Sequence, residues 1–279
     1  MEHLPNAIII EALTHVTWNS KKVQQDIAVA RKNSKGVDYS DQELKEIIRR
    51  GWREMRILEG YASQWKKPEQ INDIMGIWVP SGPGFIEKPY KDDRYKNYEW
   101  SRFMGRRRLM YAALLMRKTA EARSNGVFGS NQSIEMIEKH APILLFNGID
   151  SENTDIRDYL AREGLIIPPS KVHILGSGLN NTLDQVHNLA SQEGQEFLNS
   201  LDGHTLSIVT HVPHATRLLH LLGKNNPFPS GLGVSLLSLP TPQQGIEYKR
   251  NEICGILSHI IRGEATVEPF IPSNISFDS

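Results

Sequence analysis

Five short apolar runs, separated by segments long enough for helices, are the feature that most constrains the fold of this chain. The runs are apolar almost throughout, a pattern typical of parallel strands that are covered on both faces. They comprise residues 74–80, 143–147, 172–175, 206–210 and 234–239. The intervening segments, predicted as crossover helices, comprise about 100–123, 151–163, 180–199, 213–222 and 245–262. A βα unit repeated in this way predicts an α/β, Rossmann-like fold with a doubly wound, mainly parallel sheet of about five strands.

The beginning of the chain has a different pattern, without strong strand signals. Ser40 and Glu43 fit a capping box, because the serine oxygen can accept the third backbone N–H while Glu43 reaches back to the cap. Apolar residues from Leu44 to Tyr61 then recur at spacings of three and four, which predicts one long amphipathic helix. We therefore predict a helical amino-terminal subdomain at 1–70, an α/β domain at 71–265 and a carboxy-terminal tail at 266–279.

The charge balance limits the partners that the protein can attract. The 279 residues include 32 basic and 32 acidic side chains, so no net field would draw the chain to nucleic acid or to an acidic membrane. No apolar stretch approaches the roughly 20 residues that span a bilayer. The single cysteine, Cys254, excludes an internal disulfide and fits a reducing compartment. We expect a cytoplasmic protein with no nucleic-acid or membrane partner, and the sequence predicts no particular oligomeric state.

Polar or glycine-rich residues follow four of the predicted strands. The carboxyl ends of parallel strands share one edge of the sheet, and ligands bind in the crevice there. The candidate residues are Ser81, Gly82 and Gly84 after the first run, Asn147, Gly148, Ser151 and Glu152 after the second, Asn181, Thr182 and Asp184 after the third, and Thr210, His214 and Arg217 after the fourth. Turn formation alone explains any one cluster, so it is their coincidence on one edge that predicts a small-molecule pocket.

Each cluster also opens a helix, where free backbone N–H groups and the positive end of the helix dipole favour an anion. His214 and Arg217, three residues apart, could form an anion-binding or acid–base pair. Helix capping with a surface charge is the competing interpretation. His211 and His214 could instead face a metal ion, but no third ligand follows closely and no metal site is predicted.

Three adjacent arginines, Arg106, Arg107 and Arg108, fall in the helix after the first strand. They fan over most of a helical turn, so one could face the crevice and grip a carboxylate or phosphate bidentately. A solvated helix face explains the other two. The long connection at 82–98 is interpreted as a lid or a disordered insertion.

Standard motifs are missing from these loops. The glycines fit neither the G-x-G-x-x-G dinucleotide fingerprint nor the P-loop with its lysine. No G-x-S-x-G elbow occurs, which disfavours a standard serine hydrolase.

The order of the clusters resembles the YdcF-like family, a domain of unknown function shared with the SanA and ElyC envelope proteins. The resemblance covers about 74–263, and the comparable family patterns read S-E-A, N-T-x-E-N and V-T-x-x-x-H-x-x-R. The matching residues here are Ser151-Glu152, then Asn181-Thr182 with Asp184-Gln185, then Val209-Thr210 with His214 and Arg217. Arg108 is the nearest match to a helix arginine of the family, and Arg107 is a close rival.

The chain departs from the family at several positions. Gly176 stands where the family has an acidic residue, and Leu179 stands where it has a serine. The Glu and Asn of N-T-x-E-N are Asp184 and Gln185 here. The resemblance implies a Rossmann-type domain with a smaller helical part. Binding of S-adenosylmethionine by one member implies a nucleoside-type ligand, and no other cofactor is indicated.

Two functions compete on this basis. The first is an enzyme, a hydrolase or a transferase, that acts on a small phosphorylated, nucleotide-like or carboxylated substrate. Its acid–base residues would be Glu152 and His214, its anion-holding residues Arg108 and Arg217, and its orienting residues Ser81, Asn147, Asn181 and Thr182. The second is a noncatalytic sensor of a nucleoside ligand such as S-adenosylmethionine, which the glycine at position 176 favours. Consumption of that ligand would indicate a methyltransferase instead.

Overall fold

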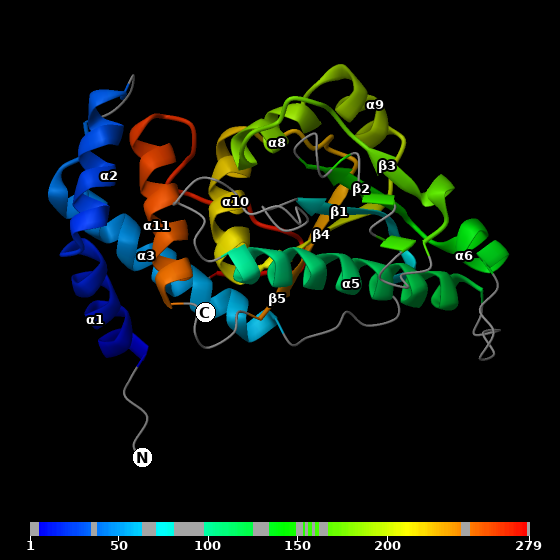
Figure 1. Cartoon of the computed structure of the whole chain (residues 1–279), viewed down its shortest axis with the longest axis horizontal. Coiled ribbons are helices and arrows are strands. Elements are labelled where there is room, and N and C mark those ends of the chain that lie inside the picture. Colours follow the sequence, from blue (N-terminus) through cyan, green and yellow to red (C-terminus); the bar gives the residue numbers. More distant parts are fainter. Residues whose placement is uncertain are drawn as a thin grey trace, which may run out of the picture.

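The computed structural model describes residues 6–34, 38–62, 71–80, 98–124, 134–148, 153, 156–157, 160–161, 167–240 and 246–277. Within 98–124, side chains are described from residue 107 onward. Its centre is a five-stranded, all-parallel sheet with the order β3-β2-β1-β4-β5 (Figure 1). The strands are β1 (Ile74–Pro80), β2 (Ile143–Asn147), β3 (Val172–Ile174), β4 (Thr205–His211) and β5 (Gly233–Leu239). The predicted α/β fold and the five predicted strands are therefore confirmed.

Helices connect the strands as crossovers. They are α5 (Tyr98–Arg123), α6 (Ile134–His140), α8 (Thr182–Leu189), α9 (Gln192–Asn199), α10 (Val212–Lys224) and, after β5, α11 (Ile246–Ile261), with a short 3₁₀ turn η2 at Pro169–Lys171. The segment 180–199 is split into two helices, because Ser191 starts a new one by accepting a hydrogen bond from Gly194 N at 3.2 Å. The residues described within 151–163 are helical.

The two faces of the sheet carry separate hydrophobic cores. In β1, Ile77 and Val79 belong to the core that is completed by α5 and α6, whereas Trp78 belongs to the core on the other face. This alternation follows from the two-residue period of a strand. Leu109 of α5 lies in the first core and Leu218 of α10 in the second, so these two crossovers cover opposite faces of the sheet.

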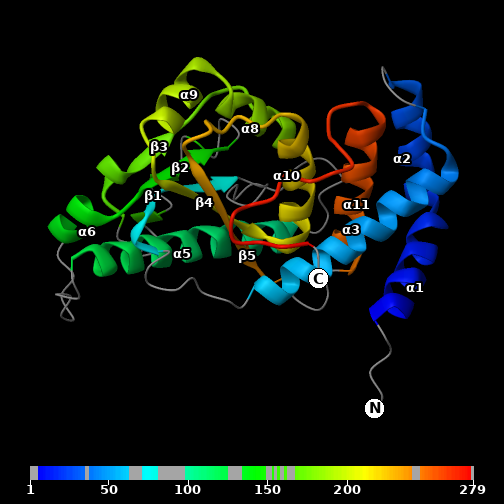
Figure 2. The ribbon, with the colours of Figure 1, turned by 180° about the vertical axis from the view of Figure 1, so that it is seen from behind.

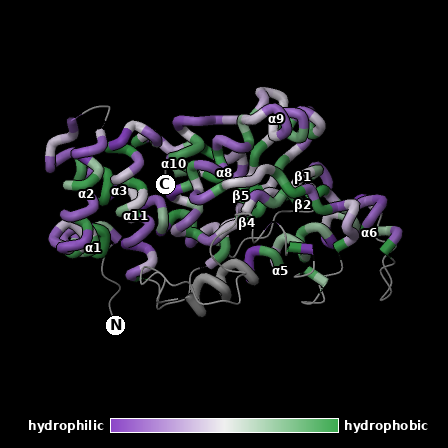
Figure 3. Tube along the Cα trace, turned by 45° about the horizontal axis from the view of Figure 1, so that its top comes forward, coloured by the Kyte–Doolittle hydropathy of each residue, from purple (hydrophilic) through white to green (hydrophobic). Residues whose placement is uncertain are grey.

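The amino-terminal helices pack onto the second core. They are α1 (Asn6–Trp18), α2 (Lys21–Lys32) and α3 (Asp41–Tyr61), and they lie with α11 at one end of the molecule beside α10 (Figures 1 and 2). The capping box of α3 is confirmed, with Ser40 N donating to Glu43 Oε2 at 2.7 Å. Figure 3 shows hydrophobic and hydrophilic stretches alternating along these helices, as expected when one side of each is buried.

The carboxy-terminal segment runs along the outer edge of β5. Ser273 N donates to Val234 O at 2.8 Å, and Leu236 N donates to the Asn274 side-chain oxygen at 2.8 Å. An exposed strand edge offers unpaired backbone groups to other chains, so this segment protects β5. Among the helices that the structure describes, none is long and apolar enough to cross a membrane.

Candidate functional site

The strand order places the topological switch point of the sheet between β1 and β4. The chain leaves β1 through α5 on one face and leaves β4 through α10 on the other. In open α/β sheets this arrangement opens a crevice at the carboxyl ends of the two strands. The strands end at Pro80 and His211, so the candidate site is centred on these two residues.

Arg108 bridges the two strand ends from α5. Its side chain is buried, and its Nη1 donates to Pro80 O at 2.9 Å while its Nε donates to His211 Nδ1 at 3.2 Å. The neighbouring Arg107 is half-buried and lies over the Tyr111 ring, with 5.9 Å between the guanidinium carbon and the ring centroid. Of these two arginines, Arg108 is therefore the one at the switch point. The side chain of Arg106 lies outside the described part of the chain.

A second set of polar side chains meets around the first turns of α10. Arg217 Nη2 donates to Thr182 Oγ1 at 3.0 Å, and Arg217 Nε lies 2.9 Å from Glu252 Oε2. His214 Nδ1 lies 3.4 Å from Arg217 Nη2 and 4.0 Å from Glu252 Oε1. His214 and Glu252 are buried, with 4% and 6% of their surfaces exposed. Helices α8, α10 and α11 each contribute to this cluster.

The electrostatics keep both imidazoles neutral. Burial lowers the pKa of His211 well below its ordinary value, and the charges of Arg108 and Arg107 lower it further. Burial likewise lowers the pKa of His214, with additional effects from Arg108, Arg217 and His211. Because the two rings carry no charge near neutral pH, the guanidinium groups supply the positive potential of the site.

Tyr248 lies one turn before Glu252 on α11. Burial raises the pKa of its hydroxyl above the usual range, and the nearby Glu252 carboxylate adds to the rise, while Arg108 and Arg217 oppose it. Its phenol therefore stays protonated at the border of the charged cluster. Sequence reasoning missed Tyr248 and Glu252. The available signal was their i, i+4 spacing, which places two polar groups on the same side of a helix that is otherwise apolar where buried.

Asn147, the last residue of β2, is buried and hydrogen-bonded at both ends of its amide. Its Oδ1 accepts from Trp78 Nε1 at 2.8 Å, and its Nδ2 donates to Gln185 O at 2.9 Å. These bonds tie β1 and β2 to α8. The amide thus holds the strand ends in place.

The loops after β2 and β3 are joined by Asn153, which sequence reasoning did not single out. The backbone N–H of Gly148 donates to Asn153 Oδ1 at 2.7 Å, and Asn153 Nδ2 donates to Gly176 O at 3.1 Å. No sequence motif marks an asparagine in this bridging position.

Asn181 and Asp184 form the amino-terminal cap of α8. Asp184 N donates to Asn181 Oδ1 at 3.1 Å, and Asp184 Oδ2 accepts from Asn180 N at 2.8 Å and from Asn181 Nδ2 at 3.0 Å. Asn181 is exposed, whereas the adjacent Thr182 is buried and contacts Arg217. In this loop it is Thr182 that reaches the cluster.

Of the remaining candidate residues, one lies in the described part of the chain and five lie outside it. Thr210 is buried in β4, and its hydroxyl has no hydrogen-bond partner among the described residues. Five predicted residues, Ser81, Gly82, Gly84, Ser151 and Glu152, lie outside the described residues, as does nearly all of the predicted lid. The structure thus brings together Arg108, Thr182, His214 and Arg217 from the predicted set and adds His211 and Glu252.

His211 and His214 lie three residues apart at the junction of β4 and α10. Within the ranges that the structure describes, no group of three or more His, Cys, Asp or Glu side chains could hold a metal ion.

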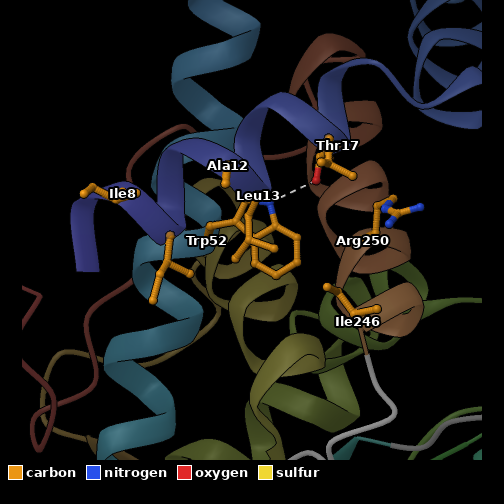
Figure 4. A pocket seen from close by; sticks show the side chains of 9 residues that line it. Ile8, Ala12, Leu13, Thr17, Trp52, Ile246 and Arg250 are labelled. Carbon is orange, nitrogen blue, oxygen red and sulfur yellow. Dashed lines mark hydrogen bonds between the residues drawn. The ribbon is translucent and has the colours of Figure 1, made fainter. Parts of the chain in front are cut away.

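A separate hollow of about 260 Å³ lies between α1, α3 and α11 (Figure 4). Apolar side chains such as Ile8, Leu13 and Trp52 line it, and Arg250 stands at its side. It shares no residue with the switch-point cluster. An apolar lining provides few groups that could hold an anion, so this hollow is a different kind of surface from the site at the sheet edge.

The fold and the polar cluster define a class, an all-parallel, doubly wound α/β protein with buried arginine and histidine side chains at its switch point. No protein-family model, curated protein or solved structure matches the chain.

Proposed function

We propose that this protein is an enzyme, similar to the YdcF-like family, that acts on a small phosphorylated, nucleotide-like or carboxylated substrate at the switch point between β1 and β4. The observation that carries the proposal is the cluster of the buried Arg108, His211 and His214 with the half-buried Arg217 at the ends of these strands. Together with Glu252 the cluster contains two guanidinium groups, one carboxylate and two neutral rings. This excess of positive charge in a buried setting favours an anionic ligand.

Each residue has a role in the proposal. Arg217 holds the anion, oriented by Thr182 and Glu252 at 3.0 and 2.9 Å, and Arg108 adds positive potential at the ends of β1 and β4. Glu152 and His214 serve the proton transfers. A cytoplasmic protein with a nucleotide-like or phosphosugar ligand, and with no nucleic-acid or membrane partner, fits the balanced charge of the chain.

A thermal-shift screen against nucleotides, phosphosugars and S-adenosylmethionine, followed by product analysis of each hit, tests the proposal. Binding raises the unfolding temperature, and an enzyme also forms product. The variants Glu152→Ala and His214→Ala should abolish turnover while the protein still folds. Turnover retained in both variants would remove these two residues from the mechanism.

Two Glu→Gln variants on α11, which change the charge by the same amount, test whether the site prefers anions because of its local positive charge. Glu252→Gln removes the buried negative charge beside Arg217, so phosphate-bearing ligands should bind roughly three- to tenfold more tightly at low salt. Glu247→Gln removes an exposed negative charge on the same helix and should leave affinity within about twofold, because solvent screens it. Equal effects of the two variants would argue against a local anion site.

One observation favours the second candidate, a noncatalytic sensor of a nucleoside ligand such as S-adenosylmethionine. Gly176 occupies the position where the family that the chain resembles carries an acid, and it has a φ of +79°. A Cβ atom there would lie 2.3 Å from the Asn188 Nδ2 atom. The local fold therefore disfavours any side chain at this position, and chemistry that needs that acid would be lost. Ligand stabilisation without product in the screen would identify the sensor.

A further inference from the structure

The hydrogen bond between Arg108 and His211 determines which ring nitrogen of His211 carries the proton. A guanidinium group only donates hydrogen bonds, and Arg108 Nε lies 3.2 Å from His211 Nδ1. Pro80 O fixes the same guanidinium by accepting from Nη1 at 2.9 Å. His211 Nδ1 is therefore an acceptor, and the neutral ring carries its hydrogen on Nε2.

His214 is in the same situation on the next helix. Its Nδ1 lies 3.4 Å from Arg217 Nη2, closer than the 4.0 Å to Glu252 Oε1. The longer distance is beyond hydrogen-bonding range, so the arginine donor decides the tautomer. The neutral His214 ring also carries its hydrogen on Nε2.

Both Nε2 atoms are buried and have no hydrogen-bond partner among the described residues. His211 is fully buried, and His214 is 4% exposed. A buried donor without an acceptor costs free energy of folding. Because His211 ends β4 and His214 lies in the first turn of α10, the two donors stand at the switch point, where a ligand could accept from them.

We propose that His211 and His214 are a pair of neutral Nε2–H donors that bind oxyanion oxygens of the ligand, such as those of a phosphate or carboxylate group. Arg108 is a positioning residue that holds the His211 ring in this tautomer, and Arg217 holds the His214 ring in the same way in addition to its proposed contact with the anion. The inference rests on the proposed function and narrows it. With Nε2 already protonated, the neutral His214 ring donates to a ligand oxygen and abstracts no proton, so the inference replaces the proton-transfer role proposed for His214 with a donor role.

Ring-nitrogen NMR of the ¹⁵N-labelled full chain tests this directly. Long-range correlation spectra at neutral pH report the tautomer of each histidine, and the variants His211→Phe and His214→Phe assign the two rings. Titration with inorganic phosphate, with sodium sulfate as a second oxyanion, should shift both Nε2–H signals saturably. A proton on Nδ1 in either ring, or Nε2–H signals that do not respond to either oxyanion, would overturn the inference.

Binding to variants at position 214 gives a second readout. His214→Phe keeps the ring shape but removes the donor, so phosphate affinity should fall about tenfold or more. The folded state should remain at least as stable, because an unpaired buried donor is removed. His214→Gln returns an N–H donor and should recover part of the affinity, whereas His187→Phe, at an exposed histidine of α8, should change nothing. Unchanged phosphate affinity in His214→Phe would refute the donor role.

The proposed enzyme function and the inference of two Nε2–H donors can fail separately. A protein that turns over a phosphorylated substrate but carries its ring protons on Nδ1 keeps the proposed function and loses this inference. A protein whose Nε2–H donors bind phosphate but that forms no product in the screen keeps the inference and loses the enzyme.

Discussion

Arg108 on α5 donates a hydrogen bond from Nε to Nδ1 of His211, the last residue of β4, over 3.2 Å. The two residues are far apart in the sequence and come from the two sides of the topological switch point. The bond therefore ties the crossover after β1 to the end of β4. It orders the backbone of the candidate site as well as the histidine ring.

The adjacent arginines 107 and 108 provide a matched test of this contact. Lysine cannot reproduce the fork with which Arg108 donates to both Pro80 O and His211 Nδ1. Arg108→Lys should lower the free energy of unfolding by roughly 2–4 kcal/mol, because it weakens two buried, charge-assisted hydrogen bonds. Arg107→Lys, which changes a contact with the Tyr111 ring, should cost about 1 kcal/mol or less. Urea denaturation measures both, and equal losses would contradict the special role of Arg108.

The loop after β3 contains two glycines, and the first of them, Gly176, is needed for two separate reasons, its positive φ and the space that a side chain would occupy. Gly176 and Gly178 both have positive φ, +79° and +68°, so alanine at either should cost roughly 1–2 kcal/mol of backbone strain. Gly176→Ala should cost more than Gly178→Ala, because its Cβ would meet the Asn188 side chain, whereas no atom of the described residues lies within 4 Å of a Cβ added at Gly178. When Asn188→Ala is added to Gly176→Ala, we expect the loss of unfolding free energy caused by Gly176→Ala to become smaller, because the clash with the Asn188 side chain is removed. A double variant as unstable as the sum of the single changes would show that the clash is not the cause.

Two buried histidines, His211 and His214, and the largely buried His259 should make the protein sensitive to mild acid. Burial lowers the pKa of His211 and His214 well below 6.5, and it lowers that of His259 to about 4 despite the Glu264 carboxylate. The unfolded chain binds these protons at a higher pH than the native state does. The stabilisation is therefore fully present above pH 6.5 and declines as the pH falls from 6.5 towards the lower folded pKa values.

Urea unfolding between about pH 7.5 and pH 5 measures this decline. The free energy of unfolding should drop steadily below pH 6.5, and His259→Asn should flatten the slope, because one of the three protons is removed from the linkage. A stability that stays constant or rises towards pH 5 would contradict neutral burial of these rings.

Strands β1, β2, β4 and β5 were predictable because they are buried on both faces, which leaves a largely apolar run in the sequence. Contacts that depend on the path of distant helices were not predictable. Glu252 reaches Arg217 only because α11 returns over α10 after β5, and no local pattern encodes that return. Asn147 has the polar character of a ligand-binding residue, yet its partners Trp78 and Gln185 occupy both ends of its amide. Residue type at a strand end predicted where the polar cluster lies, but tertiary contacts decide which members face a ligand.

A buried pair, Glu54 and His220, crosses the boundary predicted near residue 70 between the helical subdomain and the α/β domain. Glu54 of α3 lies 2.8 Å from Nε2 of His220 on α10, and Nδ1 of the same ring lies 2.7 Å from Thr266 O. Arg50 Nε donates to the other Glu54 oxygen at 2.9 Å. Helix α3 also contributes Leu44, Ile48 and Met55 to the core that contains Trp78 of β1. Helix and sheet should therefore unfold together.

Glu54→Ala tests this coupling, because it leaves His220 and Arg50 without their buried carboxylate. The free energy of unfolding should fall by roughly 3–5 kcal/mol, and circular dichroism and fluorescence should still report one coincident transition. Glu59→Ala, on the same helix, breaks a partly exposed pair with Lys249 and should cost about 1 kcal/mol or less. If Glu54→Ala produced an early transition confined to part of the helical signal, α1 to α3 would be a separable subdomain. A single transition at lower urea would instead mean that His220 and Glu54 join the helices and the sheet into one cooperative unit, so that the candidate site inherits its rigidity from both.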